Sequence, residues 1–234
     1  MQDVSKLNKV VTDLLLVTEK EWGLYAFTKE LLNKKVTEDE KNEMIDKAIQ
    51  CGIEYAKRIK LLYKSEGVKE LADAFQMKVS VQDNSMIGKR IVFALYTPPN
   101  QIEIMQEPIQ RACHILENDS VLVELFKQND IINTILGHEM FHFVEEQFEQ
   151  EIYTRTKKIR LWNFIGIKYY STIRTLSEIG AMAFTKELNQ LSFSPYILDI
   201  LLYYSYDPCS AEKNYHDIME ISSGRCRNTV EGDE

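Results

Sequence analysis

The hydrophobic spacing of this chain changes twice, and these changes limit the folds open to it. From residue 7 to residue 76 apolar residues recur every three or four positions, as the buried stripe of a helix requires. Residues 78–82 then alternate between polar and apolar, 91–96 are continuously apolar as in a strand covered on both faces, and 101–104 alternate again. After Pro108 the helical spacing returns. The pattern predicts an α+β fold in which helices flank a small, largely antiparallel meander of strands.

The N-terminal region is predicted to be helical. Thr37 followed by Glu40 forms a capping-box pattern, so a helix is expected to begin there. Its apolar stripe is expected to run from Ile45 to Leu62. We therefore predict an N-terminal helical segment over residues 1–66, packed on a core formed by residues 67–234.

Composition narrows the class of protein. The chain has 234 residues, of which 44% are hydrophobic and 27% charged, as in folded globular domains. Its 28 Lys and Arg against 36 Asp and Glu give a net charge of −8, which argues against nucleic-acid binding, because neutralising phosphates needs clustered positive charge. The sequence contains no apolar run long enough to span a membrane and no export-signal pattern at its start. We therefore expect a cytoplasmic protein, with its four scattered cysteines reduced.

The pattern His138-Glu139-x-x-His142 lies inside a stretch of helical spacing, for which Asn129 or Asp130 is the expected cap. Histidines four residues apart lie one turn apart on one face, so both imidazoles reach a single ion at roughly 2.0–2.1 Å. Glu139 projects beside them, placed to accept a proton from a water that the metal activates. With only four histidines in the chain, a chance origin of this pattern is uncommon.

A catalytic zinc site needs three protein ligands, so a second segment must supply the third. Glu145 lies seven residues beyond His138, about 10 Å along the helix axis, which is too far to reach the same ion. Glu178 is the leading candidate, because Gly180 and other small residues after it allow close packing on the helix that carries His138. His216 is the main rival, and Glu178 as an ordinary solvated residue is a further alternative. If Glu178 is the ligand, the three ligand atoms are expected within about 4 Å of one another.

These motifs resemble the gluzincin branch of zinc metallopeptidases. Over residues 68–205 the chain is most similar to the ImmA/IrrE-type metallopeptidase-like proteins, on the basis of Leu136-Gly137-His138-Glu139-x-x-His142, the strand-turn-strand of residues 91–104, and Ser177-Glu178-Ile179-x-Ala181-x-x-Phe184. The resemblance implies a zincin-like core, Zn²⁺ held by His138, His142 and Glu178, and Glu139 as general base. It also implies an intracellular enzyme, and some members of that family cleave transcriptional repressors. The chain departs from the pattern at Phe141, where the family usually has Gly, and at Met182, where thermolysin-like enzymes often have Asp.

The sequence therefore predicts a zinc-dependent metallopeptidase that hydrolyses a peptide or protein substrate. A metal-binding regulatory or interaction protein with the same fold and little turnover is the alternative, and a helical scaffold with an accidental motif is the third. A cleft beside the metal favours the enzyme, whereas a site plugged by residues 150–170 favours the binding protein. The sequence does not indicate an oligomeric state.

Two further segments have possible roles in substrate binding. Residues 153–170 mix basic and aromatic residues, and we interpret them as an amphipathic connector with its aromatic rings in the core. The alternative is a lid or wall over the metal, with positive charge for an acidic substrate. Residues 101–105 resemble an edge strand that pairs with an extended peptide. Candidate donors to a developing oxyanion are Tyr169, Tyr170, Arg174, Tyr203, Tyr204, Tyr206 and His216.

Overall fold

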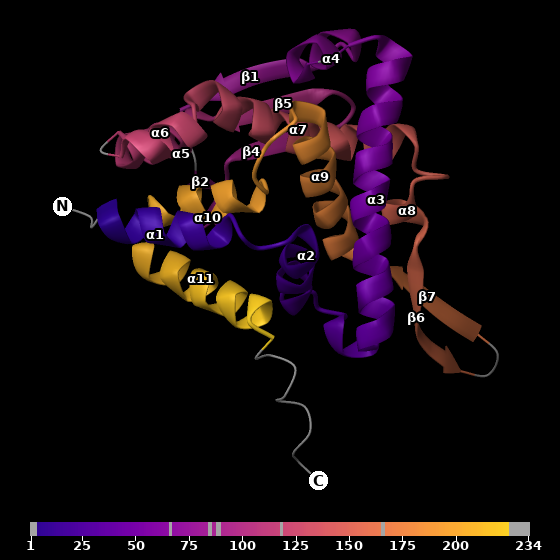
Figure 1. The fold of residues 1–234 in the computed structure, drawn as a ribbon. Coiled ribbons are helices and arrows are strands. Elements are labelled where there is room, and N and C mark those ends of the chain that lie inside the picture. Colours follow the sequence, from indigo (N-terminus) through magenta and orange to yellow (C-terminus); the bar gives the residue numbers. More distant parts are fainter. Residues whose placement is uncertain are drawn as a thin grey trace.

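The computed structural model describes residues 4–65, 67–83, 86–87, 90–117, 119–164 and 167–224 (Figure 1). Its elements in chain order are α1 (Val4–Leu14), α2 (Glu19–Thr28), the 3-10 helix η1 (Asn33–Lys35), α3 (Glu38–Tyr63), α4 (Val68–Ala74), β1 (Lys78–Gln82), β2 (Met86–Ile87), β3 (Arg90–Ile91), β4 (Ala94–Thr97), β5 (Gln101–Met105), α5 (Gln106–Leu116), α6 (Ser120–Leu125), α7 (Gln128–Gln147), α8 (Tyr153–Thr156), β6 (Lys158–Phe164), β7 (Ile167–Thr172), α9 (Arg174–Asn189), α10 (Tyr196–Tyr204) and α11 (Pro208–Ser222). The predicted α+β class is confirmed. Among the described residues, no helix has both the length and the apolar character needed to cross a bilayer.

Helix α3 begins with the expected capping box. The Thr37 hydroxyl accepts a hydrogen bond from the Glu40 N–H, and the Glu40 carboxylate accepts one from the Thr37 N–H. The apolar stripe is buried as far as Ile59, but Leu62 is 59% exposed, because α3 continues beyond the core at its C-terminal end. The predicted division of the chain at residue 66 stays a prediction.

Helix α9 lies between α3 and α7, and glycines make both contacts possible (Figure 1). A Cβ atom on Gly52 of α3 would lie 2.3 Å from the carbonyl oxygen of Gly180 on α9. A Cβ atom on Gly180 would in turn lie 2.8 Å from the ring of Phe141 on α7. Neither position has room for a larger residue, so the small residues after Glu178 bring its helix close to the helix that carries the two histidines.

The three-stranded sheet has the order β1-β5-β4 and contains both parallel and antiparallel pairs. The prediction of a largely antiparallel meander was therefore wrong. β5 pairs in parallel with β1 and antiparallel with β4. It takes the centre because Ile102 and Ile104 are its most apolar positions and are almost fully buried there. The expectation that residues 101–105 form an edge is therefore wrong, and β4 is the edge nearest α7. β4 is covered on one face only, since Leu95 is 39% exposed.

Residues 158–164 and 167–172 pair as an antiparallel hairpin, β6–β7, instead of the predicted connector. The hairpin projects from the body of the molecule beyond α8 (Figure 1). Trp162, Tyr169 and Tyr170 are each about half exposed, so the expectation that these rings lie in the core was wrong. Residues 165 and 166, which the predicted segment included, lie outside the described residues.

Candidate metal centre

Helix α7 carries both histidines of the motif. It begins directly after Lys127, whose side chain makes no capping bond, so the predicted cap at Asn129 or Asp130 is wrong, and both residues lie in the first turn. The negative carboxylate of Asp130 in this first turn interacts favourably with the positive end of the helix dipole. The four-residue spacing places the rings of His138 and His142 with their centroids 5.1 Å apart.

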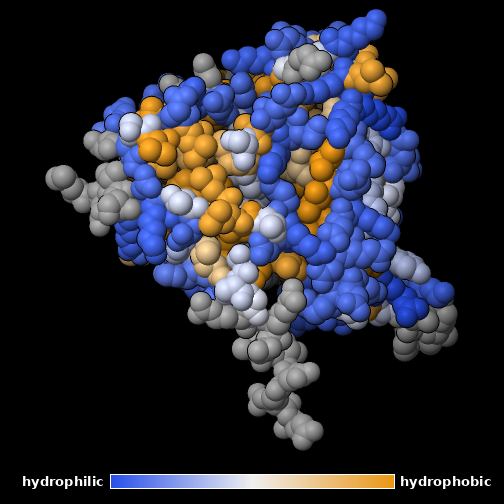
Figure 2. Space-filling view, in the orientation of Figure 1, coloured by the Kyte–Doolittle hydropathy of each residue, from blue (hydrophilic) through white to orange (hydrophobic). Residues whose placement is uncertain are grey.

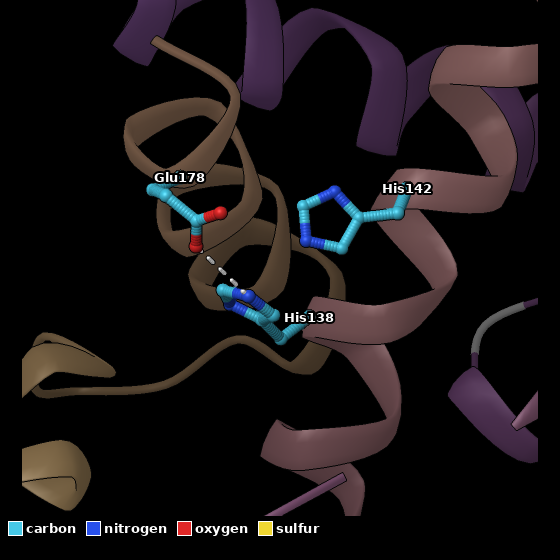
Figure 3. A group of neighbouring side chains, drawn as sticks. All are labelled: His138, His142 and Glu178. Carbon is cyan, nitrogen blue, oxygen red and sulfur yellow. Dashed lines mark ion pairs between the residues drawn. The ribbon is translucent and has the colours of Figure 1, made fainter. Parts of the chain in front are cut away.

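Glu178 projects from α9 towards these two rings (Figure 3). Nε2 of His138 lies 3.3 Å from Oε2 of Glu178, and one ligand atom from each of the three residues lies within 4.8 Å of the other two. The predicted separation of the ligand atoms was about 4 Å, based on tetrahedral bonds of roughly 2 Å to one ion. The observed group is thus slightly more open than predicted. The rival ligand His216 is exposed on α11 and does not belong to this group. The structure therefore brings together the three candidate ligands that the sequence indicated.

His138 and Glu178 change each other's protonation. Burial lowers the pKa of His138, but the hydrogen bond and the negative charge of Glu178 outweigh it and raise the pKa to about 9. Burial raises the pKa of Glu178, but the hydrogen bond and charge of His138 bring it down to about 2. The two side chains are an ion pair at neutral pH, so a cation that binds both must displace the proton of His138.

His142 is held from behind by a buried carboxylate. Its Nδ1 lies 3.3 Å from both Oε2 of Glu145 and the hydroxyl oxygen of Ser177. Glu145 is fully buried and accepts hydrogen bonds from Ser177, at 2.6 Å, and from Thr154, while Nε of Arg155 lies 3.2 Å from its Oε2. Burial raises the pKa of this carboxyl, but these partners outweigh it and lower the pKa below its usual value. Glu145 is therefore an anion, and it selects the tautomer of His142 that carries the proton on Nδ1 and leaves Nε2 free.

Glu139 is anchored to the edge strand. Its Oε2 accepts a hydrogen bond of 2.9 Å from the backbone N–H of Tyr96 on β4. The hydroxyl of Tyr96 donates to Oε2 of Glu146, two turns further along α7, at 2.7 Å. These two bonds fix the free edge of β4 against the helix. Glu139 therefore lies between β4 and the two histidines, outside the group of three ligands.

A cavity of about 950 Å³ opens beside the triad. His138, Glu139 and Glu178 line one part of it together with their neighbours on α7 and α9, residues 92–94 line another, and α2, α10 and α11 contribute much of the remainder. Among the candidate oxyanion donors, only Tyr203 lines this cavity in the described part of the chain. None of the described residues between 150 and 170 is among the lining residues, so they do not form the lid or plug considered as the alternative.

Asp199 also lines the cavity, and sequence reasoning missed it. Burial raises the pKa of its carboxyl to about 6, His138 lowers it and Glu178 raises it, so Asp199 lies within electrostatic reach of the triad. The signal that indicates it is a single acid inside the apolar run of α10. Glu145 is too far along α7 to be a ligand, but it lies three residues after His142. This spacing places it on the same helix face and is the sequence signal for its role in orienting His142.

The donor set fits a transition-metal cation. Two neutral imidazoles and one carboxylate are the ligands of many catalytic zinc sites, and here one ligand atom from each residue already lies within 4.8 Å of the other two. The buried Glu145 behind His142 is the kind of outer partner that orients a metal-bound histidine. No protein-family model matches this chain, and no curated protein or solved structure matches it either.

Proposed function

We propose that this chain is a zinc-dependent metallopeptidase with a zincin-like core, of the type that the ImmA/IrrE-like motifs imply. The observation that carries the proposal is the convergence of His138, His142 and Glu178 from two separate helices at the mouth of a cavity. The proposed enzyme acts in the cytoplasm, which agrees with the free thiols of Cys51, Cys113 and Cys209.

Zinc is the proposed cation, because tetrahedral coordination by two histidines and a glutamate leaves one position open. When bound, it supplies a Lewis acid that polarises a carbonyl and activates a water. The ligands themselves have separate tasks. Glu178 neutralises charge at the site, and His142 is kept in one orientation and one tautomer by Glu145.

Glu139 is the proposed general base. Its Oε2 is held by the Tyr96 N–H, so the carboxylate has a fixed direction and its other oxygen is left to take a proton. A carboxylate in this position accepts the proton of the attacking water and delivers it to the leaving amine. The side chain is half-buried beside the cavity, which favours proton transfer at a desolvated site.

A peptide or protein is the proposed substrate. The cavity reaches from the triad to the start of β4, where Ala94 and the preceding Phe93 contribute to its lining. β4 is an edge strand, and the backbone groups of an edge that are not used within the fold can pair with an extended peptide. The Tyr96 N–H is not one of them, because it donates to Glu139. Asp199 places a carboxylate in this cavity and Lys29 an ammonium group, so the lining carries charges of both signs with which polar groups of a substrate can pair.

The alternative, a metal-binding regulatory protein with little turnover, shares all three ligands. The open cavity beside the triad favours the enzyme over this alternative, because a protein that only binds the metal does not need such a space. Catalysis by Glu139 is the property that separates the two.

The test measures metal content and turnover on the same preparations. Protein purified without added zinc is expected to contain about one zinc per chain, and His138→Ala is expected to lose it. Glu139→Gln is expected to keep the zinc and the fold, with peptide hydrolysis lowered by about 10²–10⁴-fold, the usual contribution of a positioned acid–base group.

Glu149→Gln is the matched control, since Glu149 is exposed just beyond the end of α7 and should change neither quantity. Zinc content with no hydrolysis of any peptide in a diverse library would favour the regulatory alternative. A protein without zinc would support the accidental motif.

A further inference from the structure

The β6–β7 hairpin is a two-stranded sheet with both outer edges unpaired in the described part of the chain. It extends away from the helical body, and the side of it seen in Figure 2 is largely hydrophilic (Figures 1 and 2). Two strands alone are marginally stable in water, and unpaired edges present rows of free N–H and C=O groups. A projecting hairpin of this kind is therefore suited to receive a third strand from another chain.

The register of the hairpin gives it a basic face. Lys158 pairs with Thr172 and Arg160 pairs with Tyr170, and paired residues of antiparallel strands share a face. Lys168 lies two residues before Tyr170 and so projects on the same side. Lys158, Arg160 and Lys168 are all exposed.

None of these three cations forms an ion pair with an acidic side chain in the parts of the chain that the structure describes. The basic face is thus uncompensated, although the chain as a whole has a net charge of −8. Uncompensated clustered charge of one sign attracts a partner of the other sign.

The opposite face of the hairpin is aromatic. A bulge between Arg160 and Trp162 shifts the alternation, so that Trp162 pairs with Tyr169 instead of continuing the basic face. The two rings are stacked, with centroids 5.7 Å apart and an angle of 13° between their planes, and both remain about half exposed. Nearer the base of the hairpin, Ile159 on this face packs against the core.

We propose that a free edge of the hairpin binds an extended, acidic segment of a protein substrate by strand addition. Side chains of an added strand alternate between the two faces of the sheet. A segment that alternates acidic and apolar residues therefore places its acids against Lys158, Arg160 and Lys168, and its apolar side chains against Trp162 and Tyr169. The proposal deepens the proposed function and rests on it for the identification of the partner as a substrate.

The two-faced geometry favours such a peptide over a nucleic acid. Single-stranded nucleic acid is bound where cations and stacking rings act together, so that the backbone and its bases are held in one groove. Here the exposed stack of Trp162 and Tyr169 lies on the face opposite Arg160 and Lys168, and Tyr170 is the single exposed ring among the described residues of the basic face, so no stacked pair of rings lies beside the cations there. A net charge of −8 also repels a polyanion at long range more strongly than it repels a short acidic segment.

The position of the hairpin connects docking to the metal centre. β6 begins two residues after α8, and Thr154 and Arg155 of α8 both contact Glu145 behind His142. A substrate segment bound to the hairpin is therefore held next to α8, the helix that supports His142 through Glu145. Docking outside the cavity raises the local concentration of the cleavable segment near the site.

The test uses fluorescence anisotropy of a labelled peptide of about nine residues, long enough to pair along either strand, in which Glu alternates with Leu, Thr and Tyr. Three probes are compared with it: a peptide of the same composition with all Glu at one end, a peptide with Lys in place of Glu, and an oligo-dT of similar charge. Binding is measured on the full chain in the Glu139→Gln background, so that the peptide stays intact.

The alternating peptide is expected to bind more tightly than all three other probes. Arg160→Glu combined with Lys168→Glu is expected to weaken binding by about tenfold or more, and Trp162→Thr by several-fold. Lys34→Glu combined with Lys35→Glu makes the same change in net charge at exposed positions of η1 and should leave binding unchanged within about twofold. Circular dichroism and thermal melting confirm that each variant is folded.

Three results would overturn the proposal: equal binding of the peptide with clustered Glu, tighter binding of oligo-dT, or wild-type affinity in both hairpin variants. Zinc content is measured on the same samples. A protein that holds zinc but does not bind the peptide refutes the docking proposal alone, whereas a protein that binds the peptide but lacks zinc refutes the proposed enzyme and leaves the docking surface in place.

Discussion

The metal centre and the β6–β7 hairpin are neighbours in sequence but are held in different ways. Phe141 and Glu145 on α7 are fully buried, and helices α7 and α9 fix the side chains between them from several directions. The hairpin has two strands, and its Trp162 and Tyr169 are about half exposed. Reactive groups need a fixed geometry, whereas a recognition surface gains from free edges and exposed rings. The difference in packing thus matches the difference between the roles proposed for the two regions.

The largest effect on stability is expected at Phe141, which fills the contact between α7 and α9. Its ring packs on Phe184 at a centroid distance of 5.3 Å and lies where Gly180 leaves space. Phe141→Ala opens a cavity that the rigid helix pair cannot close, and should lower the free energy of unfolding by about 3–5 kcal/mol in urea denaturation. A loss below about 1 kcal/mol would show that this helix contact is loosely packed and would remove the contrast with the hairpin.

The next largest effect is expected at Glu145, because it joins the two regions through α8. Glu145→Ala leaves His142, Ser177 and Arg155 without their shared acceptor, and should destabilise the fold by about 2–4 kcal/mol. Zinc affinity should also fall by about 10–100-fold, since His142 loses its orientation. Competition with a chromophoric chelator measures the affinity, and Glu149→Ala is the control at an exposed acid. Unchanged zinc affinity in a folded Glu145→Ala protein would contradict the positioning role.

The sequence was sufficient to predict features with short-range causes. The capping box of Thr37 and Glu40 and the one-turn spacing of His138 and His142 depend on residues within a single helix. Glu178 was also found, because a small residue beside it indicates a close helix contact, and Gly180 indeed faces Phe141. Each of these features can be deduced from one segment and its own periodicity.

The features that were missed depend on long-range packing. The central position of β5 results from competition between strands for the buried place in the sheet, which no single strand pattern reveals. The hairpin was missed because its bulge at Leu161 breaks the alternation that marks a strand. Asp199 reaches the cavity through the packing of α10 against α5 and α11, and its segment by itself resembles an ordinary apolar helix.

The pH dependence of zinc affinity is expected to be a smaller effect than that of Glu145→Ala. It arises from the metal centre and should not depend on the hairpin. The pKa of His138 is raised to about 9 by Glu178, so the imidazole is protonated at neutral pH and zinc must displace that proton. Affinity should therefore fall as pH falls, by about tenfold per pH unit between roughly pH 8.5 and pH 7. Calorimetric titration in buffers of different ionisation enthalpy measures the proton released, and an affinity independent of pH in this range would show that the ion pair does not form.

The smallest effect on stability is expected in the hairpin. Trp162→Ala removes a ring larger than that of Phe141, but one that is 49% exposed and stacks on Tyr169. The loss in free energy of unfolding should stay below about 1.5 kcal/mol, the range for an exposed aromatic pair, and zinc affinity should not change. Urea denaturation of this variant beside Phe141→Ala measures the contrast directly. Equal losses in the two variants would mean that the hairpin is part of the cooperative core, and a strand so firmly held would not need a partner to stabilise it.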